Sequence, residues 1–231
     1  MALTLYGVSD GPPTMAVMQA LAYLDLKYKF VTINYAIGEH MTEEYAQKNP
    51  QKEMPVLDDN GFFLSESNAI LQYLADKYPK NETLYPKNVQ ARAIVNHRLC
   101  FNLSTYYRYI CEYALEPIFF TYERTQLRLK RALIALEHLN TYFSKLGGKY
   151  ATGDKITIAD FQLATTTMCL EAINCDISGY PLIQRWYNMY KVENPTLWRI
   201  LEHGMNQLAY FEKNPPVLAS LDHPIHPVRK N

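Results

Sequence analysis

The spacing of apolar residues changes character once along the chain. In the first 79 residues, short apolar runs of strand length alternate with segments that have helical spacing. The strand-like runs are residues 2–7, 28–33, 54–57 and 62–64. The helix-like segments are residues 12–24, 42–48 and 65–78. This order predicts a βαβ-α-ββα unit in the N-terminal part.

Residues that favour turns and helix ends support these boundaries. Pro12 and Pro13 suit the first turn of a helix, where a missing N–H does no harm. Asn60-Gly61 accepts the positive φ angles of a tight hairpin turn. Thr42 can cap the short second helix, and Pro79 ends the third.

The remainder of the chain has helical spacing only. The expected helices are residues 90–120, 123–146, one opening at 157, 181–192 and 195–211. We expect a bend or break near Pro117 and a helix end at Gly147-Gly148. Thr157 with Asp160 three residues later predicts a capping box. The proline-rich residues 214–231 predict an extended tail.

The predicted fold class is therefore α+β. We expect an α/β domain at residues 1–79, a polar linker at 80–89 and an all-helical domain at 90–231. Fold alone does not determine function, so the site has to be argued from its residues.

Composition narrows the function classes. Hydrophobic residues make up 48% and charged residues 20%, as in a globular protein, and 23 basic residues balance 23 acidic ones. This balance argues against a nucleic-acid or anionic-membrane partner, and neither a membrane span nor a secretion signal is evident. Four cysteines without C-x-x-C spacing predict reduced thiols in the cytoplasm and no metal site: Cys100, Cys111, Cys169 and Cys175.

Met54-Pro55 is the first candidate binding feature. A proline that enters a strand cannot donate a ladder hydrogen bond, so it requires an edge position or a special bend. A cis peptide bond is one solution, and it would turn the Met54 backbone outward to hold an extended peptide. An ordinary edge proline is the alternative.

Glu66 and Ser67 open the third helix of the N-terminal part. Amides in a first helical turn favour a carboxylate, the Ser67 hydroxyl adds a donor, and Glu66 can accept from an ammonium group. His40 and Lys52 can bind a second carboxylate. A simple helix cap and two solvated surface residues are the alternatives. Together these features describe a site for a small zwitterionic peptide with two carboxylates.

Several linked motifs carry a family resemblance. They are LYGVSDGPP, GEHM, NPQKEMPVLDDNG, ESNAILQYLADKY and LYPKN, with RLCFN at 98–102 and TIADF at 157–161. In this combination the chain resembles a cytosolic glutathione transferase, closest to the insect delta and epsilon classes and their unclassified relatives. The resemblance implies a thioredoxin-like domain that binds glutathione as co-substrate and a helical domain that binds a hydrophobic electrophile. It also implies a detoxifying enzyme of xenobiotic metabolism, and a homodimer.

The resemblance also implies roles for the candidate residues. Pro55 corresponds to a cis-proline, with the Met54 backbone pairing with the cysteinyl part of glutathione. Glu66 and Ser67 correspond to the contacts with the γ-glutamyl end. His40 and Lys52 correspond to contacts with the glycine end.

The loop before the first helix departs from the family pattern. Relatives carry a serine directly before the prolines, and its hydroxyl favours the glutathione thiolate; here Gly11 takes that place. Three replacements stay open as catalytic groups: the Ser9 hydroxyl, the Tyr6 hydroxyl, or backbone N–H groups at the start of the helix. Asp10 would oppose a thiolate, so we expect it to face solvent.

The electrophile pocket is expected between this loop, the first long helix and the end of the last helix. Its predicted residues are Gly11, Pro13, Tyr107, Cys111, Ile118, Phe119 and Phe211. Core packing is the alternative for this apolar stripe. The leading hypothesis is a glutathione transferase. The alternatives are a weakly catalytic or non-catalytic carrier of hydrophobic ligands, motivated by Gly11, and an interaction domain of a translation factor.

Overall fold

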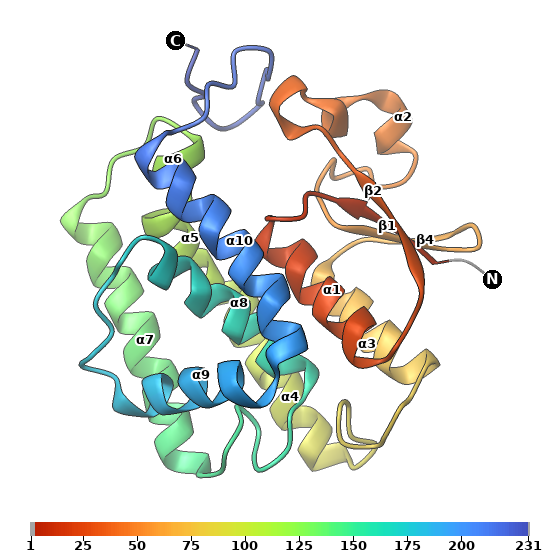
Figure 1. Ribbon diagram of the computed structural model, residues 1–231, viewed down its shortest axis with the longest axis vertical. Coiled ribbons are helices and arrows are strands. Elements are labelled where there is room, and N and C mark those ends of the chain that lie inside the picture. Colours follow the sequence, from red (N-terminus) through yellow and green to blue (C-terminus); the bar gives the residue numbers. More distant parts are fainter. Residues whose placement is uncertain (1–2, 231) are drawn as a thin grey trace.

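The computed structural model describes residues 3–230 and has two parts, an α/β part and a helical part (Figure 1). The α/β part contains four strands, three α-helices and two short 3-10 helices, Tyr35–Ile37 and Glu39–Met41. Its elements are β1 (Leu3–Gly7), α1 (Pro12–Tyr23), β2 (Tyr28–Thr32), α2 (Glu43–Ala46), β3 (Val56–Asp59), β4 (Phe62–Leu64) and α3 (Ser67–Lys77). The predicted βαβ-α-ββα order is confirmed.

The four strands form one mixed sheet in the order β2-β1-β3-β4. β1 runs parallel to β2 and antiparallel to β3, and Leu5 pairs with both Phe30 and Leu57. The hairpin between β3 and β4 turns at Asn60 and Gly61, which have φ angles of 56° and 90°, as predicted. β3 begins at Val56, two residues later than predicted, because Pro55 has no N–H for the ladder.

The helical part follows a connector between α3 and α4. Its elements are α4 (Val89–Phe101), a π-helical turn (Asn102–Tyr106), α5 (Tyr107–Ala114), α6 (Glu116–Phe119), α7 (Gln126–Leu146), α8 (Ile158–Ala172), α9 (Pro181–Glu193) and α10 (Pro195–Lys213). The structure therefore confirms the α+β class with a separate helical part.

The helix predicted over residues 90–120 is divided into pieces. Its main break lies at Leu115, and Pro117 occupies the first turn of α6, where a proline is tolerated. The π-helical turn upstream of α5 was not predicted, because no residue type in that segment signals it.

Helix α8 is the centre of the core, and almost all of its residues are buried. The predicted capping box at its start is confirmed: the Asp160 carboxylate accepts from the Thr157 N–H at 2.9 Å. The same carboxylate accepts from the Ala151 N–H at 2.8 Å and from the Trp186 indole N–H at 2.9 Å. One side chain thus ties the start of α8 to α9 and to the preceding loop.

The two parts pack together across α1, α8 and α10 (Figure 1). Gln19 on α1 donates to the Thr165 hydroxyl on α8 at 2.9 Å and accepts from the Tyr190 hydroxyl on α9. Gly204 on α10 lies so close to α1 that a Cβ there would meet Met15 Sδ at 2.3 Å. The interface is therefore both hydrogen-bonded and tightly packed.

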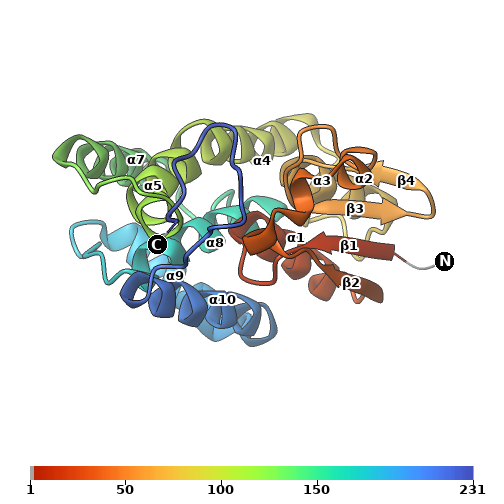
Figure 2. The ribbon, with the colours of Figure 1, turned by 90° about the horizontal axis from the view of Figure 1, so that it is seen from above.

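The C-terminal segment, residues 214–230, differs from the predicted extended tail. It leaves α10 and folds back as a loop beside α6, as Figures 1 and 2 show. The Leu218 N–H donates to the Arg229 carbonyl at 2.9 Å, so the two arms of the loop hold each other. Its prolines prevent regular structure but do not prevent this closure.

Among residues 3–230, every helix is too short or too polar to span a membrane. The same residues contain no group of three or more His, Cys, Asp or Glu side chains placed to hold a metal ion.

Candidate active site

Two adjoining cavities lie where the α/β part meets the helical part. The larger, about 380 Å³, lies between the loop after β1 and helices α5, α6 and α10, and its wall is mainly apolar. The smaller, about 170 Å³, lies between the Met54-Pro55 segment, the start of α3 and the π-helical turn. The two cavities share four residues: Pro13, Glu53, Met54 and Tyr107.

The smaller cavity contains four of the predicted glutathione contacts, Met54, Pro55, Glu66 and Ser67. The Met54–Pro55 peptide bond is cis, which decides between the two alternatives for this proline. Gln162 on α8 donates to the Ser67 hydroxyl at 2.8 Å, so the helical part positions this residue.

Glu66 has an uncommon backbone conformation at this cavity. It is the N-cap of α3 with φ 65° and ψ 105°, a combination that L-residues disfavour and that concentrates at ligand sites. Its carboxylate accepts from the Gln51 side chain at 3.1 Å. The neighbouring Asn68 also lines this cavity, but its Oδ1 atom is buried and has no hydrogen-bond partner among the described residues.

His40 and Lys52, the predicted contacts to the glycine end, are not among the described residues that line either cavity. The His40 ring is 3% exposed and stacks on Tyr35 with centroids 4.5 Å apart. The Lys52 ammonium donates to the Met41 carbonyl at 2.9 Å and to Glu43 at 3.0 Å. Their roles toward glutathione stay predictions.

The loop before α1 has no room for a side chain at Gly11. A Cβ on Gly11 would lie 2.6 Å from Val8 Cγ2, and valine is stiff at χ1. The Gly11 N–H donates to the Val8 carbonyl at 3.1 Å, which holds the turn in this shape. Asp10 is half-buried and lines the larger cavity, whereas we expected it to face solvent.

The predicted catalytic residues Ser9 and Tyr6 are not among the described residues that line the cavities, although Val8 and Asp10, the neighbours of Ser9, line the larger one. Ser9 lies in the turn that Gly11 closes. The Tyr6 side chain packs against a small apolar cluster formed by Ile33, Tyr45 and Val56. Both stay predictions as catalytic groups.

The backbone at the start of α1 offers fewer free N–H donors to a thiolate than the first turn of a helix usually does. Pro12 and Pro13 have no N–H, and the Met15 N–H donates to the Gly11 carbonyl at 2.9 Å. Within the described residues, this leaves the Thr14 N–H as the first-turn donor without a backbone partner.

The larger cavity contains most of the predicted electrophile-pocket residues: Gly11, Pro13, Tyr107, Cys111, Phe119 and Phe211. The rings of Phe119 and Phe211 meet edge to face, with centroids 5.7 Å apart. The prediction that Ile118 lines this cavity was wrong. Its side chain is 1% exposed, packs in the core and is not among the described lining residues. Helical spacing placed it on the right helix but not on the correct side.

Burial also decides the chemistry of Cys111. It raises the pKa of this thiol to about 12, with a smaller contribution from Glu116. The thiol is therefore protonated at neutral pH and is no nucleophile there. This supports the interpretation of Cys111 as a packing residue.

Sequence reasoning missed several wall residues of the larger cavity. They are Tyr35, Ala36, Glu53, Leu115, Glu116, Phe120, Pro216 and Leu218. They come from segments distant in sequence, and no local motif signals that these segments meet.

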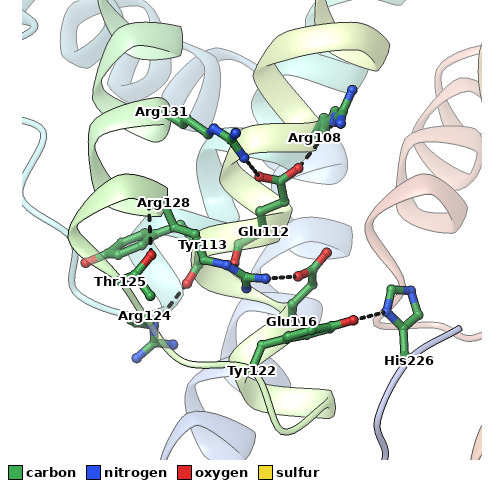
Figure 3. A network of polar contacts seen from close by, with 10 residues as sticks. All are labelled: Arg108, Glu112, Tyr113, Glu116, Tyr122, Arg124, Thr125, Arg128, Arg131 and His226. Atoms are coloured by element: carbon green, nitrogen blue, oxygen red, sulfur yellow. Dashed lines mark hydrogen bonds and ion pairs between the residues drawn. The ribbon is translucent and has the colours of Figure 1, made fainter.

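An ion-pair network supports the outer wall of the larger cavity (Figure 3). Glu116, which lines the cavity, pairs with Arg128 at 2.9 Å, and both side chains are mostly buried. Arg131 and Arg108 pair with Glu112 at 3.1 and 3.2 Å. The network joins α5 and α6 to α7 and compensates the acidic charge behind the apolar wall.

Known proteins match this chain over most of its length. Residues 1–76 match the family model "Glutathione S-transferase, N-terminal domain", and residues 106–191 match "Glutathione S-transferase, C-terminal domain". Glutathione S-transferase D6 of Drosophila melanogaster is 32% identical over 191 residues, which are 82% of this chain and 88% of that protein.

Solved structures are similar throughout. A diazinon-metabolizing glutathione S-transferase of the silkworm Bombyx mori is 51% identical with a TM-score of 0.86, over 90% of this chain and 100% of that one. A delta-class glutathione transferase of Nilaparvata lugens is 31% identical with a TM-score of 0.87, over 93% and 100% of the two chains.

These matches define the class of protein first: a two-part transferase that uses glutathione as co-substrate. The chain belongs to the glutathione S-transferase family, and its similar structures include insect delta- and epsilon-class members. It is a transferase that conjugates glutathione, as the resemblance implied, and the alternative of a non-catalytic carrier is not favoured.

Replacement of Gly11 by serine is expected to destabilise the fold. The new Cβ overlaps with Val8, so we expect Gly11→Ser to lower the free energy of unfolding by about 1 to 3 kcal/mol in urea titrations. Combining it with Val8→Ala should cost at least about 0.5 kcal/mol less than the sum of the two single losses. Strictly additive losses would contradict the overlap.

His40 should make stability depend on pH. Burial, followed by the charge of His223, lowers the pKa of His40 to about 4, whereas an unfolded histidine titrates near 6.5. The unfolded chain therefore binds more protons between these values, so stability is present above about pH 6.5 and is lost as pH falls toward 4.

The corresponding measurement compares urea unfolding at pH 7.5 and pH 4.5. We expect wild type to lose about 2 kcal/mol more over this range than His40→Phe, which keeps a ring beside Tyr35. The exposed His203→Gln variant is the control and should behave as wild type. Equal pH dependence in wild type and His40→Phe would show that His40 does not carry the effect.

Proposed function

We propose that this transferase holds glutathione in the smaller cavity and a hydrophobic electrophile in the larger one, and that its role is detoxification. The observation that carries this proposal is the contact between the two cavities at Pro13, Glu53, Met54 and Tyr107. A thiolate at this junction meets the electrophile directly, so proximity supplies part of the catalysis. The apolar wall suits aromatic or alkyl electrophiles. The similar Bombyx mori protein is a diazinon-metabolizing glutathione S-transferase.

The proposed orientation of glutathione follows from the polar groups of the smaller cavity. The γ-glutamyl end lies at Glu66 and Ser67, and its ammonium group donates to the Glu66 carboxylate, which also accepts from Gln51. The cysteinyl part pairs with the Met54 backbone beside the cis-proline.

The glycine end of glutathione is proposed to lie toward His40 and Lys52. The Lys52 ammonium would then exchange its exposed partner Glu43 for the ligand carboxylate. Such an exchange is inexpensive, because an exposed ion pair contributes only about 0 to 1 kcal/mol. His40, neutral at pH 7, would contribute a hydrogen bond and no charge.

We propose Tyr107 as the hydroxyl that stabilises the thiolate. It lies at the junction of both cavities, where Ser9 and Tyr6 do not line the wall. Burial raises the pKa of Tyr107 well above its ordinary value, so its hydroxyl stays protonated and can donate. The Thr14 N–H is a second donor nearby.

Three conservative variants test this assignment together with the function. Wild type should bind glutathione in calorimetric titrations and turn over an aromatic halide. Tyr107→Phe should lower kcat/KM by about 100-fold, as loss of a catalytic donor does, while glutathione affinity stays near wild type. Ser9→Ala and Tyr6→Phe should stay within about threefold of wild type.

Other outcomes of these measurements would assign the thiolate donor to another group or contradict the proposed function. A 100-fold loss in Ser9→Ala or Tyr6→Phe would assign the hydroxyl to that residue instead. Near-normal turnover in all three variants would leave the Thr14 N–H. Absence of glutathione binding at millimolar ligand would contradict the proposed function itself.

We also propose a cytoplasmic homodimer. The free cysteines support the cytoplasm. The family's usual assembly supports the dimer, as do exposed apolar side chains on β4, where Phe62 is 49% and Phe63 39% exposed. Sedimentation equilibrium at micromolar concentration should give about twice the 26.8 kDa of one chain. The double variant Phe62→Ser/Phe63→Ser should shift the protein toward monomer. A wild-type mass of one chain would contradict the dimer.

A further inference from the structure

The C-terminal segment (residues 214–230) bridges the two parts of the molecule. In Figure 2 it crosses from the end of α10 over the helical part toward the loop that follows β2. The contacts of the segment decide whether it is a loose tail or part of the site.

The base of the segment is attached to α6 and the residues after it. The Thr121 N–H donates to the Pro227 carbonyl at 2.9 Å. The Arg229 guanidinium donates to the Ile118 carbonyl and to the Pro216 carbonyl, each at 3.2 Å. One arginine therefore joins both arms of the loop to the helix beside the larger cavity.

Two histidines stabilise the returning arm. The His226 ring stacks on Phe120 with centroids 4.2 Å apart, and its Nδ1 lies 3.3 Å from the Tyr122 hydroxyl (Figure 3). His223 Nδ1 accepts from the backbone N–H of His226 at 3.0 Å, which closes a turn. Phe120 itself lines the larger cavity, so the stack also fixes a wall residue.

The tip of the segment contacts the α/β part. Leu221 is fully buried, and a Cβ placed on Gly38 would lie 3.3 Å from its Cδ1 atom. Gly38 has φ 73°, and the loop that contains it also supplies the wall residues Tyr35 and Ala36. The segment thus reaches the opposite side of the cavity.

Between base and tip, two residues of the segment face the larger cavity. Pro216 and Leu218 are among its lining residues, and Leu218 is only 2% exposed. The neighbouring Val217 is 51% exposed and does not line the cavity. The segment therefore presents alternate residues to the cavity and to solvent.

We propose that the C-terminal segment is the specificity-determining wall of the electrophile site, with Leu218 as its main contact. This proposal rests on the proposed function of the larger cavity. Leu218 contacts the electrophile directly, whereas Leu221 and His226 are positioning residues that hold the wall in place. The wall favours compact hydrophobic electrophiles, and its loss admits bulkier ones.

The test compares Leu218→Ala with the matched control Val217→Ala in the full chain. With a compact aromatic halide at saturating glutathione, Leu218→Ala should raise KM by roughly 5- to 20-fold, as for lost packing in an apolar pocket. The ratio of kcat/KM for a bulky over a compact electrophile should rise by a similar factor. The KM for glutathione should stay within twofold, and Val217→Ala should match wild type in every value.

The positioning residues have their own readout. Leu221→Ala and His226→Ala should shift the same bulky-to-compact ratio in the same direction, without change in the KM for glutathione. A residue that only stabilises the fold would lower the melting temperature but leave this ratio unchanged.

Binding separates failure of this proposal from failure of the proposed function. Leu218→Ala should bind S-hexylglutathione more weakly than wild type by roughly 5-fold or more in calorimetric titrations, with unchanged affinity for glutathione. Wild-type binding without turnover would overturn the proposed function alone. Equal turnover and equal S-hexylglutathione affinity in Leu218→Ala and Val217→Ala would overturn the proposal that the C-terminal segment determines specificity.

Discussion

The hydrogen-bonded start of helix α8 is the constraint on which the rest of the structure depends. The buried Asp160 carboxylate accepts from Thr157, Ala151 and Trp186, which fixes where α8 begins and what packs beside it. The helix then contacts α1, α3, α4, α5 and α10. It reaches the site through Gln162, which orients Ser67. A buried hydrogen-bond network of this kind is strong only when every polar group in it has a partner. Because the network holds α8 in place, it also holds Gln162 and thereby Ser67.

The two cavities explain how a family chemistry can tolerate an altered loop. Transfer to the glutathione sulfur requires a bound thiol, a neighbouring electrophile and some stabilisation of the thiolate. In the proposed arrangement the first two follow from the junction at Pro13 and Tyr107, which does not involve a side chain at position 11. Val8 occupies the space that a serine would need at Gly11, so the packing of this loop leaves no room for the hydroxyl that the family pattern places there. The stabilising group is then free to come from another element.

Much of the fold and part of the site could be predicted from local signals. Asn60-Gly61, the Thr157–Asp160 capping box and the Pro12-Pro13 helix start were all predicted correctly, because each depends on neighbours within a few residues. The break at Leu115 lies close to the bend or break expected near Pro117. The π-helical turn and the burial of Ile118 were not predicted, because packing between helices decides them. His40 and Lys52 were selected by residue type, and only the structure reveals their present partners.

By itself, the sequence determined the α+β class, the βαβ-α-ββα order and the family, since hydrophobic periodicity and turn residues act locally and the motifs lie in continuous stretches. Tertiary structure decided which hydroxyl lies at the junction of the two cavities and which segments close the larger one. Tyr107, Phe120 and Leu218 come from three distant segments, and their meeting at one cavity depends on long-range packing. The C-terminal segment illustrates the difference. Its prolines predicted an extended tail, but contacts with α6 and with Gly38 fold it into a wall.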